Sequence, residues 1–267
     1  MSITFDLAGK NAVVIGGAGG LGQAITQGLI EAGAKVLISD IKQESMDRAK
    51  QEILDAYGVE IETRLIDATD ESQVEALVPD AVEALGGPVS ILVNAQGFNS
   101  KADALDFDMS VFRQMLEANV VTLMMTAKHF GRHFKDNGYG KIVNLSSVRG
   151  KIATKHSGNA GYCTTKGAVD MLTKQLASEF GQYGITVNAI GPTGTVTPMM
   201  AETYRQRAEA AGMSFEDYLK DQGAGLPMRR SAMPEDIVGT AVFLASPASD
   251  FMTGNILYPD GGLTAIG

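Results

Sequence analysis

Short apolar runs alternate with amphipathic stretches along nearly the whole chain. Helical patterns fill the intervals between the apolar runs, which fall at 12–15, 35–39, 61–65, 90–93, 141–145, 186–190 and 255–258. Short, near-continuous apolar runs are typical of strands that are buried on both faces of a sheet. Strands that alternate with helices predict a parallel sheet joined by crossover helices, with a ligand at the carboxyl ends of the strands.

This alternation predicts an α/β fold of the doubly wound, Rossmann type. We expect a seven-stranded, mainly parallel sheet with helices on both faces. A chain of 267 residues suits one three-layer domain, and no linker, repeat or low-complexity tract divides it. Residues 1–267 are therefore expected to form a single domain that carries both the ligand-binding and the catalytic residues.

A glycine-rich turn follows the first apolar run. Gly16, Gly20 and Gly22 lie between that run and an amphipathic helix, in NAVVIGGAGGLGQAITQGLIEAG. Glycines let the backbone approach phosphates, while the free N–H groups and the positive end of the helix face the anion. The turn predicts a pyrophosphate site, and a plain tight connection between strand and helix is the alternative.

The second apolar run ends in Asp40, which follows Gly22 by eighteen residues. This is about where a carboxylate would meet the adenosine ribose, accept hydrogen bonds from its hydroxyls and repel a 2′-phosphate. Ile41 comes next, and the glycine turn contains no Arg or Lys that could neutralise such a phosphate. NAD is therefore predicted in preference to NADP, whereas a helix N-cap or loop role for Asp40 is the alternative.

Tyr162 and Lys166 lie four residues apart in GYCTTKGAV, so one helical turn puts them on the same face. A buried cation beside a phenol favours the phenolate and lowers the phenol pKa from about 10 towards the range of a general base. Ser147 follows the apolar run in KIVNLSS, where its hydroxyl could polarise a reacting oxygen. These residues predict proton transfer with an alcohol, and an ordinary surface Tyr–Lys pair is the alternative.

In combination these motifs resemble the short-chain dehydrogenase/reductase family, over essentially the whole chain. The family's G-x-x-x-G-x-G turn matches the three glycines, with Leu21 inside it, although Ile15 stands where Thr is usual. The outer positions of its N-N-A-G motif match Asn94 and Gly97, whereas the middle pair reads Ala-Gln. The second Asn of that motif usually supports the sheet, so its loss is expected to affect packing more than catalysis.

The resemblance implies a catalytic tetrad of Asn119, Ser147, Tyr162 and Lys166. Tyr162 would move the proton, and Ser147 would hold the carbonyl or alcohol oxygen. Lys166 would hold the ribose and tune Tyr162. Asn119 would support a water that links Lys166 to solvent, with a buried or helix-capping amide as the alternative.

The resemblance also implies which residues contact the cofactor. Asp67 and Ala68 would lie beside the adenine, and Thr195 and Thr197 beside the nicotinamide carboxamide. The full set of expected contacts is Gly16, Gly20, Leu21, Gly22, Asp40, Asp67, Ala68, Asn94, Tyr162, Lys166, Pro192, Thr195 and Thr197. Family members are usually tetramers or dimers, so a homotetramer or homodimer is expected.

Two segments bear on the substrate. Residues 199–233 form a polar helical insertion in the region that closes over the substrate in the family, so we expect a mobile lid that excludes water. A docked surface excursion or a subunit contact is the alternative. Between Ser147 and Tyr162 runs VRGKIATKHSGNAG, which is polar, basic and two residues longer than the family's common spacing.

That second segment suits a hydroxyl-rich or anionic small molecule, because it offers cations and hydrogen-bonding side chains near the catalytic groups. It resembles the corresponding loop of the family's sugar-alcohol and sugar-phosphate dehydrogenases, although these side chains could also simply face solvent. The residues concerned are Arg149, Lys151, Lys155, His156, Ser157 and Asn159.

The leading hypothesis is an NAD-dependent oxidoreductase that interconverts a secondary alcohol and a ketone on a polyol or sugar-like substrate. A reductase of 3-oxoacyl thioesters and a dehydrogenase of alicyclic or steroid alcohols are alternatives within the same family. A non-catalytic, nucleotide-sensing regulator is the alternative from another class. The intact tetrad favours an enzyme.

Composition limits the other possibilities. The formal net charge is −9, so no basic surface field favours nucleic acid or anionic membranes as partners. The one cysteine, Cys163, can form no internal disulfide and is expected to be a packed side chain; together with the lack of an export signal this predicts the cytoplasm. His129 and His133 have a helical spacing, but without an evident Cys or acidic partner we expect exposed histidines and no metal site.

Overall fold

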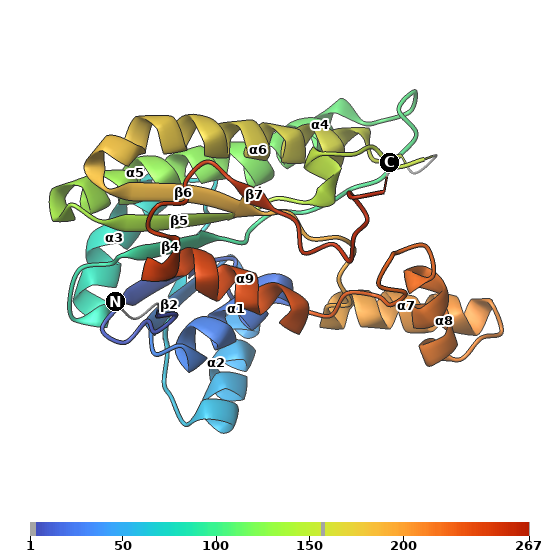
Figure 1. The fold of residues 1–267 in the computed structure, drawn as a ribbon, viewed down its shortest axis with the longest axis horizontal. Helices are drawn as coiled ribbons and strands as arrows, with labels where there is room; N and C mark the ends of the chain where they lie inside the picture. The colour runs from blue at the N-terminus through green and yellow to red at the C-terminus, as the bar shows by residue number, and fades with distance from the viewer. Residues whose placement is uncertain (1–3, 156–157, 267) are drawn as a thin grey trace.

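The computed structural model describes residues 4–155 and 158–266, so His156 and Ser157 of the basic loop lie outside the described residues. Its centre is a seven-stranded sheet in the order β3-β2-β1-β4-β5-β6-β7 (Figure 1). Every pair of neighbouring strands is parallel. The strands are β1 (Asn11–Ile15), β2 (Lys35–Asp40), β3 (Glu62–Leu65), β4 (Ile91–Asn94), β5 (Gly140–Leu145), β6 (Ile185–Ile190) and β7 (Ile256–Leu257).

The predicted fold class is confirmed, because each apolar run forms a strand of this parallel sheet. The central strands β1, β4, β5 and β6 are buried along their whole length, as expected for strands covered on both faces. At the sheet edge β3 is only partly covered, which agrees with its polar sequence ETRL. The strand order reverses between β1 and β4, and such a switch point opens a crevice at the carboxyl ends of the strands.

Helices cover both faces of the sheet (Figure 1). On one face α1 (Gly20–Glu31), α2 (Gln43–Tyr57) and α9 (Glu235–Ala245) pack on one apolar core, which includes Val14 and Ile38. On the other face α3 (Glu71–Leu85), α5 (Thr122–Asn137) and α6 (Ala160–Phe180) pack on a second core, which includes Val13 and Leu37. The side chains of neighbouring residues in a strand therefore pack into opposite cores, as the alternation of side chains along a strand requires.

Two further helical segments depart from this plan. Helix α4 (Met109–Leu116) runs into α5 through a π-helical turn, Glu117–Val121. The predicted helical insertion forms α7 (Pro198–Ala210) and α8 (Phe215–Gly223), which project from the body of the molecule in Figure 1. These two helices pack on each other, with the rings of Tyr204 and Tyr218 5.5 Å apart. Whether this pair acts as a lid remains a prediction.

The expectation that both histidines of α5 are exposed is wrong for His129, which is only 6% exposed. Because α3 packs against α5, the His129 ring Nε2 lies 3.0 Å from the carboxylate of Glu71, an acidic partner distant in sequence. His133 Nε2 accepts a hydrogen bond from the Val89 backbone N–H.

Across residues 4–155 and 158–266, no cluster of three or more His, Cys, Asp or Glu side chains could hold a metal ion. None of the described helices is both long and apolar enough to cross a membrane.

Candidate active site

The predicted site residues gather at the carboxyl edge of the sheet. In the strand registers, the end of β1 lies beside the ends of β2 and β4, and the end of β5 lies beside that of β6. The glycine turn, Asp40, Ser147 and Pro192 each follow or end one of these strands. The edge where the strand order reverses therefore carries the residues expected to bind a dinucleotide and those expected to transfer a proton.

The glycine turn packs so closely that side chains are excluded at two positions. A Cβ on Gly16 would lie 2.8 Å from the backbone nitrogen of Gln96, and one on Gly22 would lie 2.1 Å from the carbonyl oxygen of Gly16. Gly16 also has a φ of 73°, a left-handed conformation that favours glycine. Helix α1 begins after Gly19 with no side-chain cap, which leaves N–H groups of its first turn free for an anion.

The adenosine side of the crevice combines a carboxylate with apolar surface. Asp40 accepts hydrogen bonds on Oδ1 from the backbone N–H groups of Ile41, at 2.8 Å, and Lys42, at 3.3 Å. Asp40 is paired in the sheet register with Leu65, and the side chains of Ile41 and Leu65 are 60% and 55% exposed. Exposed apolar groups beside a held carboxylate fit an adenine ring and its ribose.

Asp67 lies after β3, next to Ala68. Its Oδ1 accepts hydrogen bonds from the backbone N–H and the hydroxyl of Thr69, at 2.9 and 2.7 Å. The backbone N–H of Asp67 donates to Gln73 Oε1. These contacts fix the loop at the edge of the crevice, where adenine recognition by Asp67 and Ala68 remains a prediction.

Ser147 and Tyr162 approach each other from β5 and α6. Ser147 Oγ accepts a hydrogen bond from the Arg149 backbone N–H at 3.2 Å and donates to the Pro192 carbonyl at 3.4 Å. Burial raises the pKa of Tyr162, while its hydrogen bond with Ser147 and the nearby charge of Arg149 oppose this shift. The expectation of a lowered phenol pKa is therefore wrong for this structure, because desolvation outweighs the groups that favour the phenolate.

Lys166 is buried one turn along α6, with 5% of its surface exposed. Its ammonium donates a hydrogen bond to the Leu145 carbonyl at 2.7 Å and lies 5.6 Å from the centre of the Tyr162 ring. Burial lowers the pKa of Lys166 to about 8, although the carboxylate of Asp170 opposes the shift. Since an ammonium carries three donors, two remain for Tyr162 and a ribose.

Asn119 lies in the π-helical turn and is completely buried. Its Oδ1 accepts from the Phe98 backbone N–H at 2.9 Å, and its Nδ2 donates to the Phe98 carbonyl at 2.9 Å and to Thr165 Oγ1 at 3.1 Å. The side chain thus ties the segment after β4 to helix α6 beside Tyr162. The role in supporting a water stays a prediction, since these three bonds already occupy the amide in the way the buried-amide alternative describes.

Asn94 has a similar position in the interior, with no exposed surface. Its Nδ2 donates to Asn144 Oδ1 at 2.9 Å, and its Oδ1 accepts from the hydroxyl of Thr126 at 2.8 Å. Asn144 in turn donates to Thr173 Oγ1 at 3.0 Å. The side chain of Asn94 therefore braces β4 and β5 with two helices, and a predicted cofactor contact would have to come from its backbone.

The segment after β6 lies close to the glycine turn. Pro192 is buried, and Thr195 forms an isolated bridge with Ala232, at the end of the α7–α8 insertion. Thr197 caps α7 through a hydrogen bond from the Met200 backbone N–H at 3.4 Å. A Cβ on Gly20 would lie 3.7 Å from Thr197 Cγ2, so the structure places the expected nicotinamide segment beside the expected phosphate turn.

Sequence reasoning missed a buried polar cluster behind Lys166. Asp170 is 8% exposed and accepts hydrogen bonds from the hydroxyls of Ser146 and Tyr258, the second at 3.1 Å. The available signal was spacing, since Asp170 follows Lys166 by one helical turn. Tyr258 gave no such signal, because it lies 88 residues away along the chain.

Comparison with known proteins gives matches over nearly the full length. A family model described as enoyl-(acyl carrier protein) reductase matches residues 16–264. The galactitol 2-dehydrogenase (L-tagatose-forming) of Cereibacter sphaeroides is 37% identical over 261 residues, which cover 97% of each chain. The gluconate 5-dehydrogenase of Gluconobacter oxydans is 35% identical over 97% of this chain and 96% of its own.

A solved structure agrees with these matches. It is a gluconate 5-dehydrogenase from Burkholderia cenocepacia in complex with NADP and tartrate, and it has a TM-score of 0.86 at 32% identity. The similarity covers 99% of both chains. Sequence and fold therefore agree over nearly the whole length of the chain.

Proposed function

Because the chain belongs to the short-chain dehydrogenase/reductase family, we propose that it transfers hydride between a nicotinamide cofactor and a secondary alcohol of a polyol or sugar-like substrate. The observation that carries this proposal is the convergence of Ser147, Tyr162 and Lys166 at the carboxyl edge of the sheet that also carries the glycine turn. The names of the sugar-alcohol and gluconate relatives support the substrate class.

In this mechanism the bound nicotinamide supplies or accepts the hydride, and the chain's own residues handle the proton. Tyr162 donates its proton to a ketone oxygen or accepts one from an alcohol, while Ser147 holds that oxygen by a hydrogen bond. Since burial raises the pKa of Tyr162, the neutral phenol is already the acid that ketone reduction needs. Alcohol oxidation needs the phenolate, which the Lys166 cation favours.

NAD is proposed as the cofactor on the evidence of Asp40. Its carboxylate is held at the end of β2 by two backbone N–H groups, where a 2′-phosphate would meet a negative charge. The Burkholderia cenocepacia structure contains NADP, so the resemblance to such relatives does not by itself support NAD. The ratio of kcat/KM for NAD to that for NADP tests the proposal, and a ratio below one would contradict it.

An anionic substrate such as an aldonate is a second candidate, and Arg149 favours it. The Arg149 guanidinium is half-buried, donates to the Ala153 carbonyl at 3.2 Å and lies near enough to Tyr162 to influence its pKa. Within residues 4–155 and 158–266, no ion pair involves Arg149, Lys151 or Lys155. Cations without a carboxylate partner beside the reacting groups suit a substrate carboxylate.

The deciding experiment is a substrate panel in which turnover is measured by the absorbance of the reduced nicotinamide. It contains neutral polyols, aldonates, phosphorylated polyols, alicyclic and steroid alcohols and a 3-oxoacyl thioester, each with both cofactors. Turnover of polyols or aldonates supports the proposal. Turnover confined to thioesters or to alicyclic and steroid alcohols supports the family alternatives instead, and tight NADH binding without turnover of any member favours a nucleotide-sensing regulator.

Arg149→Gln separates the two substrate candidates within the same panel. The change removes the charge while retaining a side chain that can donate a hydrogen bond to the Ala153 carbonyl. If a carboxylate binds there, KM for an aldonate should rise about tenfold or more, while KM for a neutral polyol of equal length stays within about twofold. Equal effects on both substrates would contradict an anion site at Arg149.

The remaining proposals concern the surroundings of the site. We propose that residues 199–233 act as a substrate lid, supported by the link between Thr195 and Ala232 that joins both ends of this insertion to the nicotinamide segment. A homotetramer or homodimer and a cytoplasmic location are proposed from the family resemblance. Light scattering of the purified protein tests the assembly, and a monomer at micromolar concentration would contradict it.

A further inference from the structure

Asp170 is a buried carboxylate whose hydrogen-bond donors are uncharged. Its Oδ1 accepts from Ser146 Oγ, and its Oδ2 accepts from Tyr258 Oη at 3.1 Å. Among the residues that the structure describes, no lysine, arginine or histidine lies within 4 Å of it. The proposed proton transfer does not use Asp170, although it lies on the same helix as Tyr162 and Lys166.

Such a group is expensive to bury. A carboxylate removed from water without a cationic partner loses hydration that neutral donors only partly replace, and burial accordingly raises the pKa of Asp170. The fold also packs tightly around this carboxylate, since a Cβ on Gly150 would lie 2.5 Å from Asp170 Oδ2. A neutral residue of similar size would be cheaper to bury, so a charge at this position calls for a functional reason.

The position of Asp170 supplies that reason. It follows Lys166 by one helical turn, and the hydroxyl of Ser146 contacts both the Asp170 carboxylate and, at 3.4 Å, the Lys166 backbone carbonyl. Ser146 precedes Ser147, so the Asp170 carboxylate links the segment that carries Ser147 to helix α6, which carries Tyr162 and Lys166. Among the described residues, the one hydrogen-bond partner of the buried Lys166 ammonium is the Leu145 carbonyl, which does little to offset the loss of hydration.

We propose that Asp170 is a positioning residue that keeps Lys166 in its cationic form and fixes the Ser146–Ser147 segment against helix α6. Its negative charge acts on the ammonium through the low-dielectric interior, while its two hydrogen bonds hold the end of β5 and the Tyr258 segment in place. The catalytic part of this inference rests on the proposed function. The effect on the charge of Lys166 does not.

Other charged or titratable groups face the pair and are part of its electrostatics. Lys174 lies one turn beyond Asp170 and, like Lys166, favours its ionised form. Tyr258 lies against Asp170, with the Lys151 ammonium 4.9 Å from its ring centre and the Asp260 carboxylate nearby. Tyr162 lies one turn before Lys166. All of these groups remain when Asp170 alone is neutralised.

The test compares Asp170→Asn and Asp170→Ser with the matched control Tyr258→Phe. Both Asp170 variants remove the charge, one with an isosteric amide and one with a smaller hydroxyl, so that the test survives if one of them fails to fold. The control removes one hydrogen bond to the carboxylate but keeps its charge. NADH affinity is measured by fluorescence between pH 6 and about 10, and kcat/KM for alcohol oxidation is measured over the same range.

Because the pKa of Lys166 falls when the negative charge is removed, NADH binding and kcat/KM should decline at lower pH in both Asp170 variants. The midpoint of this decline on the alkaline side, the alkaline limb, should lie about one pH unit lower in the Asp170 variants than in the parent. In Tyr258→Phe it should stay within about 0.3 unit of the parent. An alkaline limb that stays in place or moves up in a folded Asp170 variant would overturn the proposal, even if kcat falls.

The two readouts also separate this inference from the proposed function. If no alcohol in the panel is turned over, the proposed function fails. The pH dependence of NADH binding still reports the charge of Lys166 in that case, because its ammonium is the group expected to hold the ribose. A shifted binding curve then supports the inference, and coincident binding curves for the parent and both Asp170 variants contradict it.

Discussion

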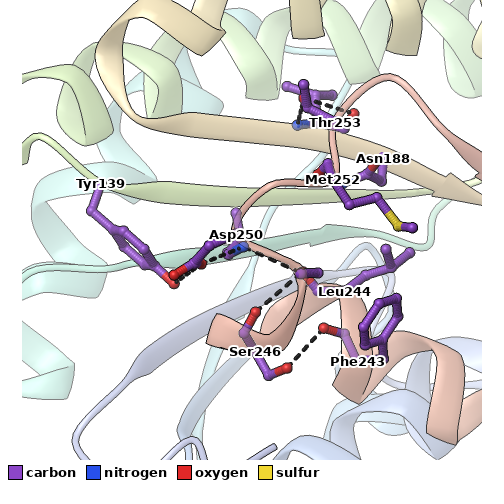
Figure 2. A network of polar contacts seen from close by, with 11 residues as sticks. Tyr139, Asn188, Phe243, Leu244, Ser246, Asp250, Met252 and Thr253 are labelled. Atoms are coloured by element: carbon purple, nitrogen blue, oxygen red, sulfur yellow. Dashed lines mark hydrogen bonds and ion pairs between the residues drawn. The ribbon is translucent and has the colours of Figure 1, made fainter. Parts of the chain in front are cut away.

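Two buried lysines lie near opposite ends of strand β5, Lys141 on the strand itself and Lys166 on helix α6, and they differ in their partners. At the amino end Lys141 is 1% exposed, yet its ammonium lies 2.8 Å from the Asp250 carboxylate and donates to Ser249 Oγ at 3.2 Å. Tyr139 points towards the same carboxylate in Figure 2, with its hydroxyl 3.4 Å from Oδ1. At the carboxyl end the Lys166 ammonium donates to the Leu145 carbonyl, and within residues 4–155 and 158–266 no carboxylate lies within 4 Å of it.

The same chemical group therefore has two roles at opposite ends of one strand. At the amino end burial lowers the pKa of Lys141, but the hydrogen bond and the charge of Asp250 oppose that shift, and the pair links β5 to the segment after α9. At the carboxyl end burial lowers the pKa of Lys166 to about 8, within reach of ordinary working pH. A paired charge favours stability of the fold, whereas an unpaired one can change its protonation during a reaction.

The largest expected effect is at the carboxyl end. Tyr162→Phe removes the hydroxyl that moves the proton but keeps the ring, so turnover should fall about 10³-fold or more. NADH affinity should stay within about threefold, since the ring and Lys166 remain. Steady-state kinetics and NADH fluorescence measure the two quantities.

Tyr139→Phe is the matched control, because it deletes a phenol hydroxyl at the amino end of the same strand. Its turnover should remain within about twofold of the parent. Comparable losses in both variants, or retained turnover in Tyr162→Phe, would show that the two ends of the sheet do not divide the roles as described.

The next effect concerns stability and its dependence on pH. The folded pKa of Lys166, about 8, lies below the unfolded value of about 10.5, so the unfolded chain binds more protons between these limits. The fold should therefore gain stability as pH rises from 8 to 10.5, by about 3 kcal/mol from this group. Lys166→Met should lack that gain and lose most of its turnover.

Urea unfolding of the parent and of Lys166→Met at several pH values checks this expectation. As pH rises, the unfolding free energy of the parent should increase relative to that of Lys166→Met, because only the parent has a buried ammonium that can lose its proton. Parallel stability curves would mean that the Lys166 ammonium is not strained in the folded protein.

At the amino end the expected effect is smaller and falls on the fold. Asp250→Asn leaves the Lys141 ammonium buried without its carboxylate, which should cost about 2 kcal/mol of unfolding free energy. Turnover per folded molecule should not change, because Asp250 lies at the opposite edge of the sheet from Ser147. Urea unfolding and active-site-normalised kinetics measure both, and a loss of turnover without a loss of stability would break the comparison.

How far the sequence predicts these features depends on the range of the interactions. The strands could be predicted because an apolar run such as 141–145 signals burial by itself, and Gly22 because its close packing against Gly16 within one turn demands a glycine. The partner of His129 could not, because Glu71 lies 58 residues earlier and meets it only when α3 packs on α5.

The pKa shifts in the site could not be predicted from the sequence either, because they also depend on residues that are far apart along the chain. A Tyr–Lys spacing of one turn shows that a cation can lie near Tyr162, and this suggested a lowered phenol pKa. The structure adds desolvation by burial, which is the largest cause of the shift, so the pKa of Tyr162 is raised instead. Spacing along one helix cannot reveal how much water is excluded by the rest of the fold.

The smallest expected effect concerns a charge at the carboxyl edge that is held but not deeply buried. Asp40→Ala removes the carboxylate at the end of β2, so the preference for NAD over NADP in kcat/KM should fall by about tenfold or more. Stability should change by less than about 1 kcal/mol, because the Asp40 side chain is partly exposed and accepts local hydrogen bonds from the backbone N–H groups of Ile41 and Lys42. Initial rates with both cofactors and thermal unfolding check the two expectations. A parent that already prefers NADP would show that Asp40 does not choose the cofactor. A large loss of stability would mean that Asp40, like Asp250, stabilises the fold rather than selects a ligand.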